Sequence, residues 1–316
     1  MSSVHDAQSH NKRLHQFLIY ANEALNNAKE PQDLIEVVEK ARQFNGKFRF
    51  KNRNFYLSFL GIFALFLTLL PISIDHDNGF GIFLSITLLM IAGMLFNRMR
   101  SRNRRTARLA QRIFYRDLLF DNQLEIAQSV GPYSIEALQQ RFTEFDRGNY
   151  SRSIESLIQG KFTGEKRSFS YHYLHFHYVN RREITETDSQ GRESTRVVYD
   201  HYDRYGLLLP FPYITAVKIQ HQPKLLGLNK GTYQPASIDF NKQFHVWAKE
   251  EFQAARFLTP TTVQTIENIP QHFKKAALEF ATDGELLFMF EDDDLISAKR
   301  QYDLNDPDAF LQEIAG

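Results

Sequence analysis

The sequence predicts an α+β protein: a two-helix transmembrane hairpin with helical flanks, followed by a C-terminal cytoplasmic domain of mostly antiparallel strands plus helices. Two long uncharged runs in the first third of the chain predict the hairpin. Apolar residues at spacings of three and four predict the helices, and later segments rich in Tyr, Phe, Val, Ile and Thr predict the strands. Charged residues are 24% of the 316 residues, which argues against global disorder, and the absence of cysteine excludes disulfides and cysteine-ligated metals.

The membrane hairpin is the first element to justify. Residues 55–74 carry no charge, and at about 1.5 Å per residue they span roughly 30 Å, the thickness of a hydrocarbon core. Residues 80–96 form a second apolar run, and the polar stretch 75–79 between the runs is short enough for a tight turn. Both runs are apolar on every face, whereas a core helix of a soluble protein keeps a polar stripe. We therefore expect transmembrane helices at 55–74 and 80–97.

Basic residues on both flanks predict the orientation of the hairpin. Five lie between Arg42 and Arg53 and seven between Arg98 and Arg112, with no acidic residue among them. The turn carries Asp75 and Asp77 and no Lys or Arg, so we expect both flanks, and both termini of this multi-pass chain, to be cytoplasmic. Arginines beside an anionic leaflet attract its lipids, and without interleaved aromatics they indicate no nucleic-acid partner. The residues expected to contact lipid are Arg98, Arg100, Arg102, Arg104 and Arg105.

The flanking helices and the strands set the expected domain boundaries. Helices are expected at 10–29, from Pro31, along 97–129 as a stalk, after Ser134 as N-cap, and at 151–158. Strands are expected at 168–179, 193–205, 213–219, 243–248, 277–281 and 285–290, with helices opened by Thr259-Pro260 and Asp306-Pro307. The expected domains are an N-terminal helical region 1–50, a hairpin region 51–99, a helical stalk 100–160 and an α+β domain 161–316.

A histidine-rich hairpin offers the one candidate metal site. Asp188-Ser189-Gln190-Gly191 is a turn signal between the strands 168–179 and 193–205. Alternate residues of a strand share a face, so His175 and His177 lie together and His172 lies opposite. His201, Asp200 or Asp203 on the opposing strand could supply a third ligand. The alternative is an aromatic, half-exposed strand that tolerates histidine.

Two other segments carry weaker signals. The acidic run 291–294 lacks the ligand spacing of a calcium loop, so a solvated loop is expected there. The segment 226–231 contains two glycines and a lysine but does not match a phosphate-binding loop. With no dinucleotide fingerprint and no nucleophile elbow, the sequence indicates no cofactor and no catalytic residue.

One segment resembles a known family. Phe240-Asn241-Lys242, the Phe-x-Val of 244–246, Glu251, and Ala255-Arg256-Phe257-Leu258 before Thr259-Pro260 are similar to the pattern of an uncharacterised family of bacterial two-helix inner-membrane proteins, whose shared domain has unknown function. The resemblance covers about residues 45–300, is specific only over about 30 residues, and does not extend to the His-rich hairpin. It implies a bacterial inner-membrane location and supplies no catalytic residue. Arg256, flanked by apolar residues, is expected to form a structural ion pair that ties its helix to the sheet.

These observations favour a membrane-anchored cytoplasmic binding or scaffolding protein. Its expected partners are anionic inner-leaflet lipids and another membrane or cytoplasmic protein. Small residues at Gly61 and Ala64, and at Gly81 and Ser85, permit close helix approach and hence a homo-oligomer. The alternative is a metal-dependent, hydrolase-like enzyme that uses His175, His177 and His201. A third hypothesis is a pleckstrin-like lipid- or peptide-binding fold that ends in a helix.

Overall fold

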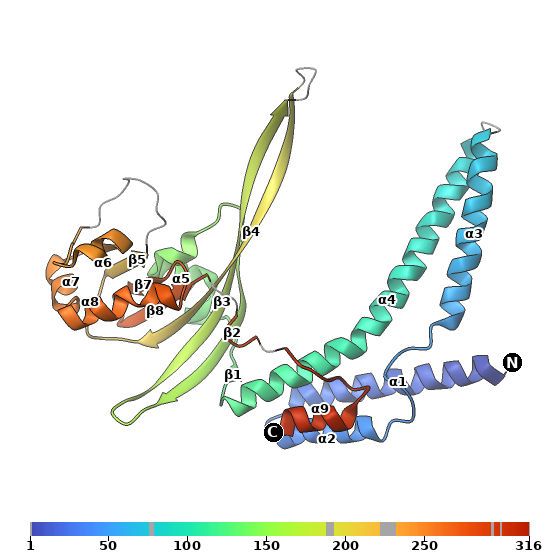
Figure 1. Cartoon of the computed structure of the whole chain (residues 1–316), viewed down its shortest axis with the longest axis horizontal. Coiled ribbons are helices and arrows are strands. Elements are labelled where there is room, and N and C mark those ends of the chain that lie inside the picture. Colours follow the sequence, from blue (N-terminus) through green and yellow to red (C-terminus); the bar gives the residue numbers. More distant parts are fainter. Residues whose placement is uncertain are drawn as a thin grey trace. The chain divides into compact units, whose positions relative to one another are not determined.

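A computed structural model describes residues 2–75, 79–187, 193–221, 232–291, 294–297 and 299–315. The chain divides into two compact units (Figure 1). Unit 1 comprises Met1–Asn122 with Ala298–Gly316, and unit 2 comprises Gln123–Ser297.

Unit 1 is helical. Its helices are α1 (Ser2–Asn27), α2 (Pro31–Arg42), α3 (Arg53–Asp75), α4 (Gly79–Asp121) and α9 (Pro307–Ala315). Apolar side chains of α1, α2, α4 and α9 form one core, which includes Leu14, Val37, Ile113 and Phe310. The helices expected around 10–29 and from Pro31 are confirmed, and Pro31 occupies the first turn of α2, where its missing N–H is not needed.

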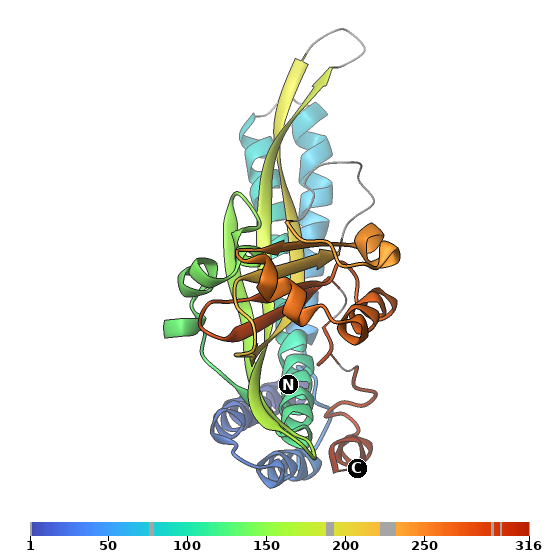
Figure 2. The same cartoon turned by 90° about the vertical axis from the view of Figure 1, so that its left-hand side faces the viewer.

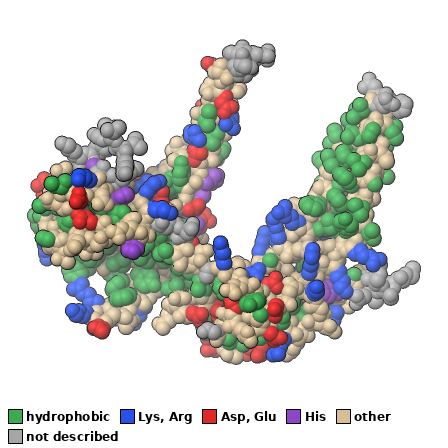
Figure 3. Space-filling view, in the orientation of Figure 1, with side chains coloured by type: hydrophobic (Ala, Val, Ile, Leu, Met, Phe, Trp, Pro, Cys, Tyr) green, Lys and Arg blue, Asp and Glu red, His purple; other side chains and the backbone are tan. Residues whose placement is uncertain are grey.

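Helices α3 and α4 lie side by side along their apolar lengths. The rings of Phe59 and Phe96 are 6.0 Å apart, and Gly81 and Ser85 of α4 are buried. Both helices are long and apolar enough to cross a membrane. Figure 3 shows hydrophobic side chains over this pair and Lys and Arg side chains near its lower end. Residues 76–78 of the expected turn 75–79 lie outside the described residues.

Helix α4 continues without a break from its apolar part into the basic segment, as the sequence predicts. It ends at Asp121, earlier than the expected 129. Gln123 has a φ of 55°, which a helix cannot accommodate, and residues 125–126 join the sheet as β1.

Unit 2 is built on one antiparallel sheet with the strand order β1-β2-β3-β4-β8-β7-β5-β6. The strands are β1 (Glu125–Ile126), β2 (Ser151–Thr163), β3 (Ser168–Thr187), β4 (Glu193–Pro210), β5 (Val217–His221), β6 (Phe244–Ala248), β7 (Ala277–Phe280) and β8 (Glu285–Phe290). The helices of unit 2 are α5 (Ile135–Arg141), α6 (Ile238–Gln243), α7 (Glu251–Phe257) and α8 (Pro260–Glu267), with short 3-10 turns η1 (Gly131–Tyr133), η2 (Thr143–Asp146) and η3 (Ile269–Gln271).

The two faces of the sheet carry separate apolar cores. Leu174 and Phe176 of β3 pack with Phe142 and Phe145 beside α5. Further along the sheet, a second core packs β5 and β6 against α6, α7 and α8, with Ile219, Phe240 and Ile266 among its members. Successive residues of β7 and β8 therefore enter the two cores in turn, and both of these strands are covered on both faces.

The hairpin of β3 and β4 is confirmed and is longer than expected. Residues 180–187 of β3 pair only with β4, beyond the ends of β2 and β8, and form a free two-stranded ribbon among the described residues. Figure 2 shows this ribbon extending past the sheet. The predicted turn residues 188–191 lie outside the described part.

The expected helix at 151–158 is wrong, because this segment is strand β2. Ile154, Leu157 and Ile158 have the spacing of a helix face. A register irregularity between Ile154 and Ser156 inserts one residue, so Ile154 opposes Phe176 and Leu157 opposes Leu174 on the same core face. Side chains on one face of a regular strand lie two positions apart in the sequence. The extra residue of a bulge makes this separation three at that point, as between Ile154 and Leu157.

The expected boundaries 100–160 and 161–316 also need correction. Residues 123–160 belong to unit 2, since β1, α5 and β2 build its sheet and core. The final helix α9 belongs to unit 1, where Phe310 and Ile314 are buried with α1 and α2. The C-terminal helix on which the pleckstrin-like hypothesis relies is thus in a different unit from the sheet.

Candidate functional site

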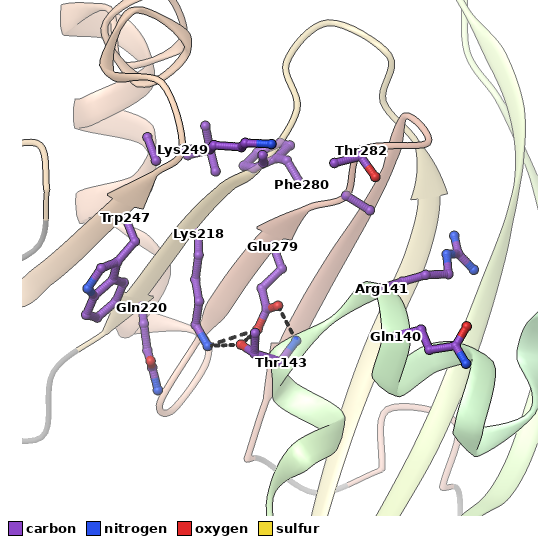
Figure 4. Close-up of a pocket in the computed structure, with 14 residues that line it drawn as sticks. Gln140, Arg141, Thr143, Lys218, Gln220, Trp247, Lys249, Glu279, Phe280 and Thr282 are labelled. Atoms are coloured by element: carbon purple, nitrogen blue, oxygen red, sulfur yellow. Dashed lines mark hydrogen bonds and ion pairs between the residues drawn. The ribbon is translucent and has the colours of Figure 1, made fainter.

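An open groove of about 610 Å³ lies on the polar face of β5, β6 and β7, beside α5 (Figure 4). Lys218 of β5 pairs with Trp247 of β6 on one side and with Glu279 of β7 on the other. Cross-strand neighbours share a face, so these three side chains form the floor of the groove. Val217 and Ile219 point to the opposite face, into the core with α6 and α8.

Hydrogen bonds fix the floor of the groove to the turn η2. Glu279 accepts from the backbone N–H of Thr143 at 2.7 Å and from its hydroxyl at 2.9 Å. The ammonium of Lys218 lies 3.0 Å from Glu279 Oε1 and also contacts the Thr143 hydroxyl. Lys218 and Glu279 neutralise each other, so this part of the groove is rigid and carries little net charge.

A buried ionic network lies behind this floor. The guanidinium of Arg147 donates to both oxygens of Glu144, at 2.7 and 2.9 Å. Arg204 Nε is 3.3 Å from Glu144 Oε2, and Arg204 Nη1 donates to Glu291 at 2.9 Å. Burial acts to raise the pKa of Glu144, but the hydrogen bonds from Arg147 and the charges of Arg204 and Lys218 outweigh it and hold that pKa below its usual value.

The open side of the groove presents an aromatic ring and an uncompensated cation. Trp247, the only tryptophan in the chain, is half-buried, and Lys249 is exposed. No carboxylate of the described residues pairs with Lys249, whereas Arg141 at the other end is held by Asp283 and Glu285. The groove therefore suits a ligand that combines an apolar or aromatic surface with a negative charge.

No protein-family model, no curated protein and no solved structure matches this chain. The resemblance of residues 240–269 to a family of bacterial membrane proteins therefore stays a prediction.

The structure gathers His175, His177 and His201 on one face of the β3–β4 hairpin, where β3 also pairs with β2. His175 Nε2 and His177 Nδ1 lie 2.7 and 2.8 Å from the same oxygen of Asp203, and His177 Nε2 lies 3.1 Å from His201 Nδ1. Burial acts to raise the pKa of Asp203, and the hydrogen bonds from His177 and His175 lower it overall. His172 lies on the other face, against Tyr133, as the strand period predicts.

This cluster is a chain of hydrogen bonds in which both nitrogens of His177 are already engaged. Asp200, a ligand candidate in the sequence, pairs with Arg182 instead. Within the described ranges, no three His, Asp or Glu side chains converge as metal ligands would.

Of the acidic run 291–294, the two described residues serve structural contacts. Glu291 pairs with Arg204 and Lys275, and Asp294 accepts from the hydroxyl of Tyr173. Asp292 and Asp293, like the segment 226–231, lie outside the described residues.

The ion pair expected of Arg256 is not formed within the part of the chain that the structure describes. Arg256 is exposed on α7, and no described carboxylate lies within ion-pair distance of it. Ala254 is buried, and a residue two positions further along a helix points away from that face. The buried arginine of unit 2 is Arg204, which sequence reasoning missed. The sequence carried a signal for the burial of Arg204. Arg204 is separated from the core residue Leu208 by an even number of positions in the same strand, so both side chains point to the same face.

The arginines expected to contact lipid follow the apolar part of α4. Arg98, Arg100, Arg104 and Arg105 are exposed, and Arg102 is half-buried. The guanidinium of Arg102 stacks on Phe50 and Phe55, at 4.5 and 5.1 Å from the ring centroids.

Proposed function

We propose that this protein is a membrane-anchored binding or scaffolding protein of the bacterial inner membrane. In this proposal α3 and α4 cross the bilayer, both termini are cytoplasmic, and unit 2 holds a partner protein in its groove. The observation that carries the proposal is the exposure of large apolar side chains along α3 and α4. Leu57, Leu67 and Ile74 of α3 and Phe80 and Met94 of α4 are each more than half exposed.

A lipid bilayer is the environment in which these exposed apolar side chains of α3 and α4 are favourably solvated. A soluble protein rarely exposes a contiguous apolar patch larger than several hundred square ångströms, and here two adjacent helices are apolar around their outer surface. The arginine-rich segments at the inner ends of both helices support the cytoplasmic orientation, because positive flanks are retained on that side during insertion.

The groove supports binding as the role of unit 2. It is open, it has a floor fixed by Lys218, Glu279 and Thr143, and it displays Trp247 and Lys249 to solvent. An extended segment of a partner protein with aromatic or aliphatic and acidic side chains complements these features. Tryptophan is enriched at the hot spots of protein interfaces.

The test uses the natural absence of cysteine. Full-length chains with one cysteine, at Gln220 in the groove or at Gln159 on the exposed side of β2, are placed in native membranes with a short thiol crosslinker. The proposal predicts that the chain stays in the membrane fraction after alkaline extraction, and that Gln220→Cys forms a discrete adduct that Gln159→Cys does not. Release of the chain from the membrane by alkali would contradict the membrane anchor. Identical crosslinked adducts from Gln220→Cys and Gln159→Cys would contradict the groove as the binding site of a partner.

The histidine cluster is the observation behind a second candidate, a metal-dependent enzyme. His175, His177 and His201 would have to exchange their mutual hydrogen bonds for a metal ion. Stoichiometric zinc in the purified full chain, lost in His175→Ala and kept in His172→Ala, would favour this candidate over the binding protein.

A further inference from the structure

A pocket of about 580 Å³ lies in unit 1 between α1 and the middle of α4. Lys12 and His15 line it from α1, Arg98, Arg102 and Arg105 line it from α4, and Phe50 lines it from the segment before α3. Residues 98, 101, 102 and 105 of a helix lie along one face, so the arginines point into one space rather than around the helix.

The positive charges of this pocket have no acidic partner among the described side chains. No described carboxylate forms an ion pair with Lys12, Arg98, Arg102 or Arg105, and no acidic residue lines the pocket. Partial burial, together with the like charges of Arg98 and Arg105, lowers the pKa of Arg102. Stacking on Phe50 and Phe55 holds the Arg102 guanidinium in place despite this repulsion. An anion in the pocket would relieve the repulsion.

The pocket also spans the point where α4 changes from apolar to charged. Met94, which is 66% exposed, lines its outer end, and Arg98 is the first charged residue after the apolar run. Asn97 and Ser101 add neutral hydrogen-bond donors between them. In a bilayer, this boundary lies at the depth of the lipid phosphates.

We propose that this pocket binds the phosphate of an anionic phospholipid headgroup. The inference rests on the proposed function, because it requires α4 to cross the bilayer. The guanidinium groups of Arg98 and Arg105 and the ammonium of Lys12 donate to the phosphate oxygens, since guanidinium and phosphate geometries match. The acyl chains continue along the exposed apolar surface beside Met94. An anionic lipid is favoured over a zwitterionic one because no carboxylate in the pocket can pair with a headgroup amine.

Helix α4 contains a matched control for this site. Arg100 and Arg104 lie on the same basic segment as Arg98 and Arg105, but neither lines the pocket. The variants R98Q/R105Q and R100Q/R104Q remove the same charge at nearly the same depth. If the lipid binds in the pocket, R98Q/R105Q should weaken lipid binding more than R100Q/R104Q. If the attraction is diffuse and electrostatic, the two double variants should weaken it equally.

The experiment places the full-length chain and both double variants in nanodiscs of phosphatidylcholine with or without phosphatidylglycerol. Retention of phosphatidylglycerol after transfer to detergent is measured by native mass spectrometry, and thermal unfolding is followed in parallel. We expect the wild-type chain and R100Q/R104Q to retain phosphatidylglycerol and to be stabilised by it. We expect R98Q/R105Q to bind it about tenfold more weakly than R100Q/R104Q.

An equal loss of phosphatidylglycerol binding in R98Q/R105Q and R100Q/R104Q would contradict binding in the pocket. Equal stabilisation of the wild-type chain by inorganic phosphate in pure phosphatidylcholine would show a site for free phosphate and would overturn the lipid assignment. Far-UV circular dichroism of R98Q/R105Q checks folding, and if this variant is unfolded, Lys12→Gln supplies the same comparison from α1. Failure of the chain to insert into any nanodisc would contradict the proposed function itself, which separates that failure from failure of the pocket.

Discussion

Arg204 of β4 and Glu144 of the turn η2 form an ion pair in which both side chains are 1% exposed, with 3.3 Å between Nε and Oε2. This pair joins strand β4 to the turn η2, whose Thr143 holds Glu279 in the floor of the groove. Arg147 and Glu291 complete the network, so each charge has an opposite partner.

Replacement of Arg204 should therefore be strongly destabilising. Arg204→Met leaves Glu144 buried with fewer positive partners, and we expect unit 2 to lose about 3–5 kcal/mol of stability. Fluorescence of Trp247 during thermal unfolding measures the effect. Arg256→Met, on an exposed arginine of the same unit, should change the stability by no more than about 0.5 kcal/mol. Similar losses in both variants would show that the network is not structural.

The same network predicts an acid sensitivity of unit 2. The pKa of Glu144 is lower in the folded chain than the ordinary value of 4.5. A depressed folded pKa contributes stability that is fully present above the unfolded value and is lost as the pH falls through the folded value. The unfolding temperature of unit 2 should thus decrease below about pH 4.5, and Glu144→Gln should reduce this dependence. An unchanged slope in the variant would assign the acid effect to other carboxylates.

Unit 1 should show the opposite dependence through Asp117 of α4. Burial, and secondarily the charge of Asp121, raises the pKa of Asp117 to about 7 from 3.8. A carboxyl with a raised folded pKa stabilises the folded state below the unfolded value, and this contribution is lost as the pH rises through the folded value. Asp117→Asn should therefore stabilise unit 1 at pH 8, by on the order of 1 kcal/mol, and have little effect at acidic pH.

Circular dichroism of the helices of the full chain during heating, at both pH values, measures this change. Asp121→Asn, on an exposed carboxylate one turn away, is the control and should have a smaller effect. Equal stabilisation by Asp117→Asn at both pH values would contradict a titrating carboxyl.

The close pairing of β4 with β8 depends on Gly206, which lies opposite Met289. A Cβ at this position would lie 2.8 Å from the backbone oxygen of Phe288 and closer still to the sulfur of Met289. Gly206→Ala should force the two strands apart and destabilise unit 2 by about 1–3 kcal/mol. In Gly61→Ala the new methyl meets nothing within 4 Å, so the stability should be kept. Thermal unfolding of both variants decides between a steric requirement and a general effect of alanine.

Local signals predicted much of this fold. The hydroxyl of Ser134 accepts from Ala137 N and that of Thr259 from Thr262 N, so both helix starts are where the cap residues predict them. Gly284 has a φ of 85°, as its place in the predicted turn requires.

The errors came from features that depend on tertiary contacts. The irregularity between Ile154 and Ser156 gave β2 the spacing of a helix, and nothing local marks α9 as part of unit 1. The groove was missed because Lys218, Trp247 and Glu279 come from three separate strands, and strand order is not encoded in any one segment. Arg204 was missed although its strand parity matches that of the core residue Leu208, and the apolar neighbours of Arg256 wrongly suggested that this arginine is paired.

The most direct test of the central claim is the accessibility of single cysteines in intact spheroplasts that express the full chain. Cysteine is placed at Asn78 between the two apolar helices, at Gln8 in α1 and at Gln301 before α9. Our account predicts that a membrane-impermeant maleimide labels Asn78→Cys in intact cells, and labels the other two only after permeabilisation. Labelling of Gln8→Cys or Gln301→Cys in intact cells, or equal labelling of all three positions before and after permeabilisation, would contradict a membrane hairpin with both termini in the cytoplasm.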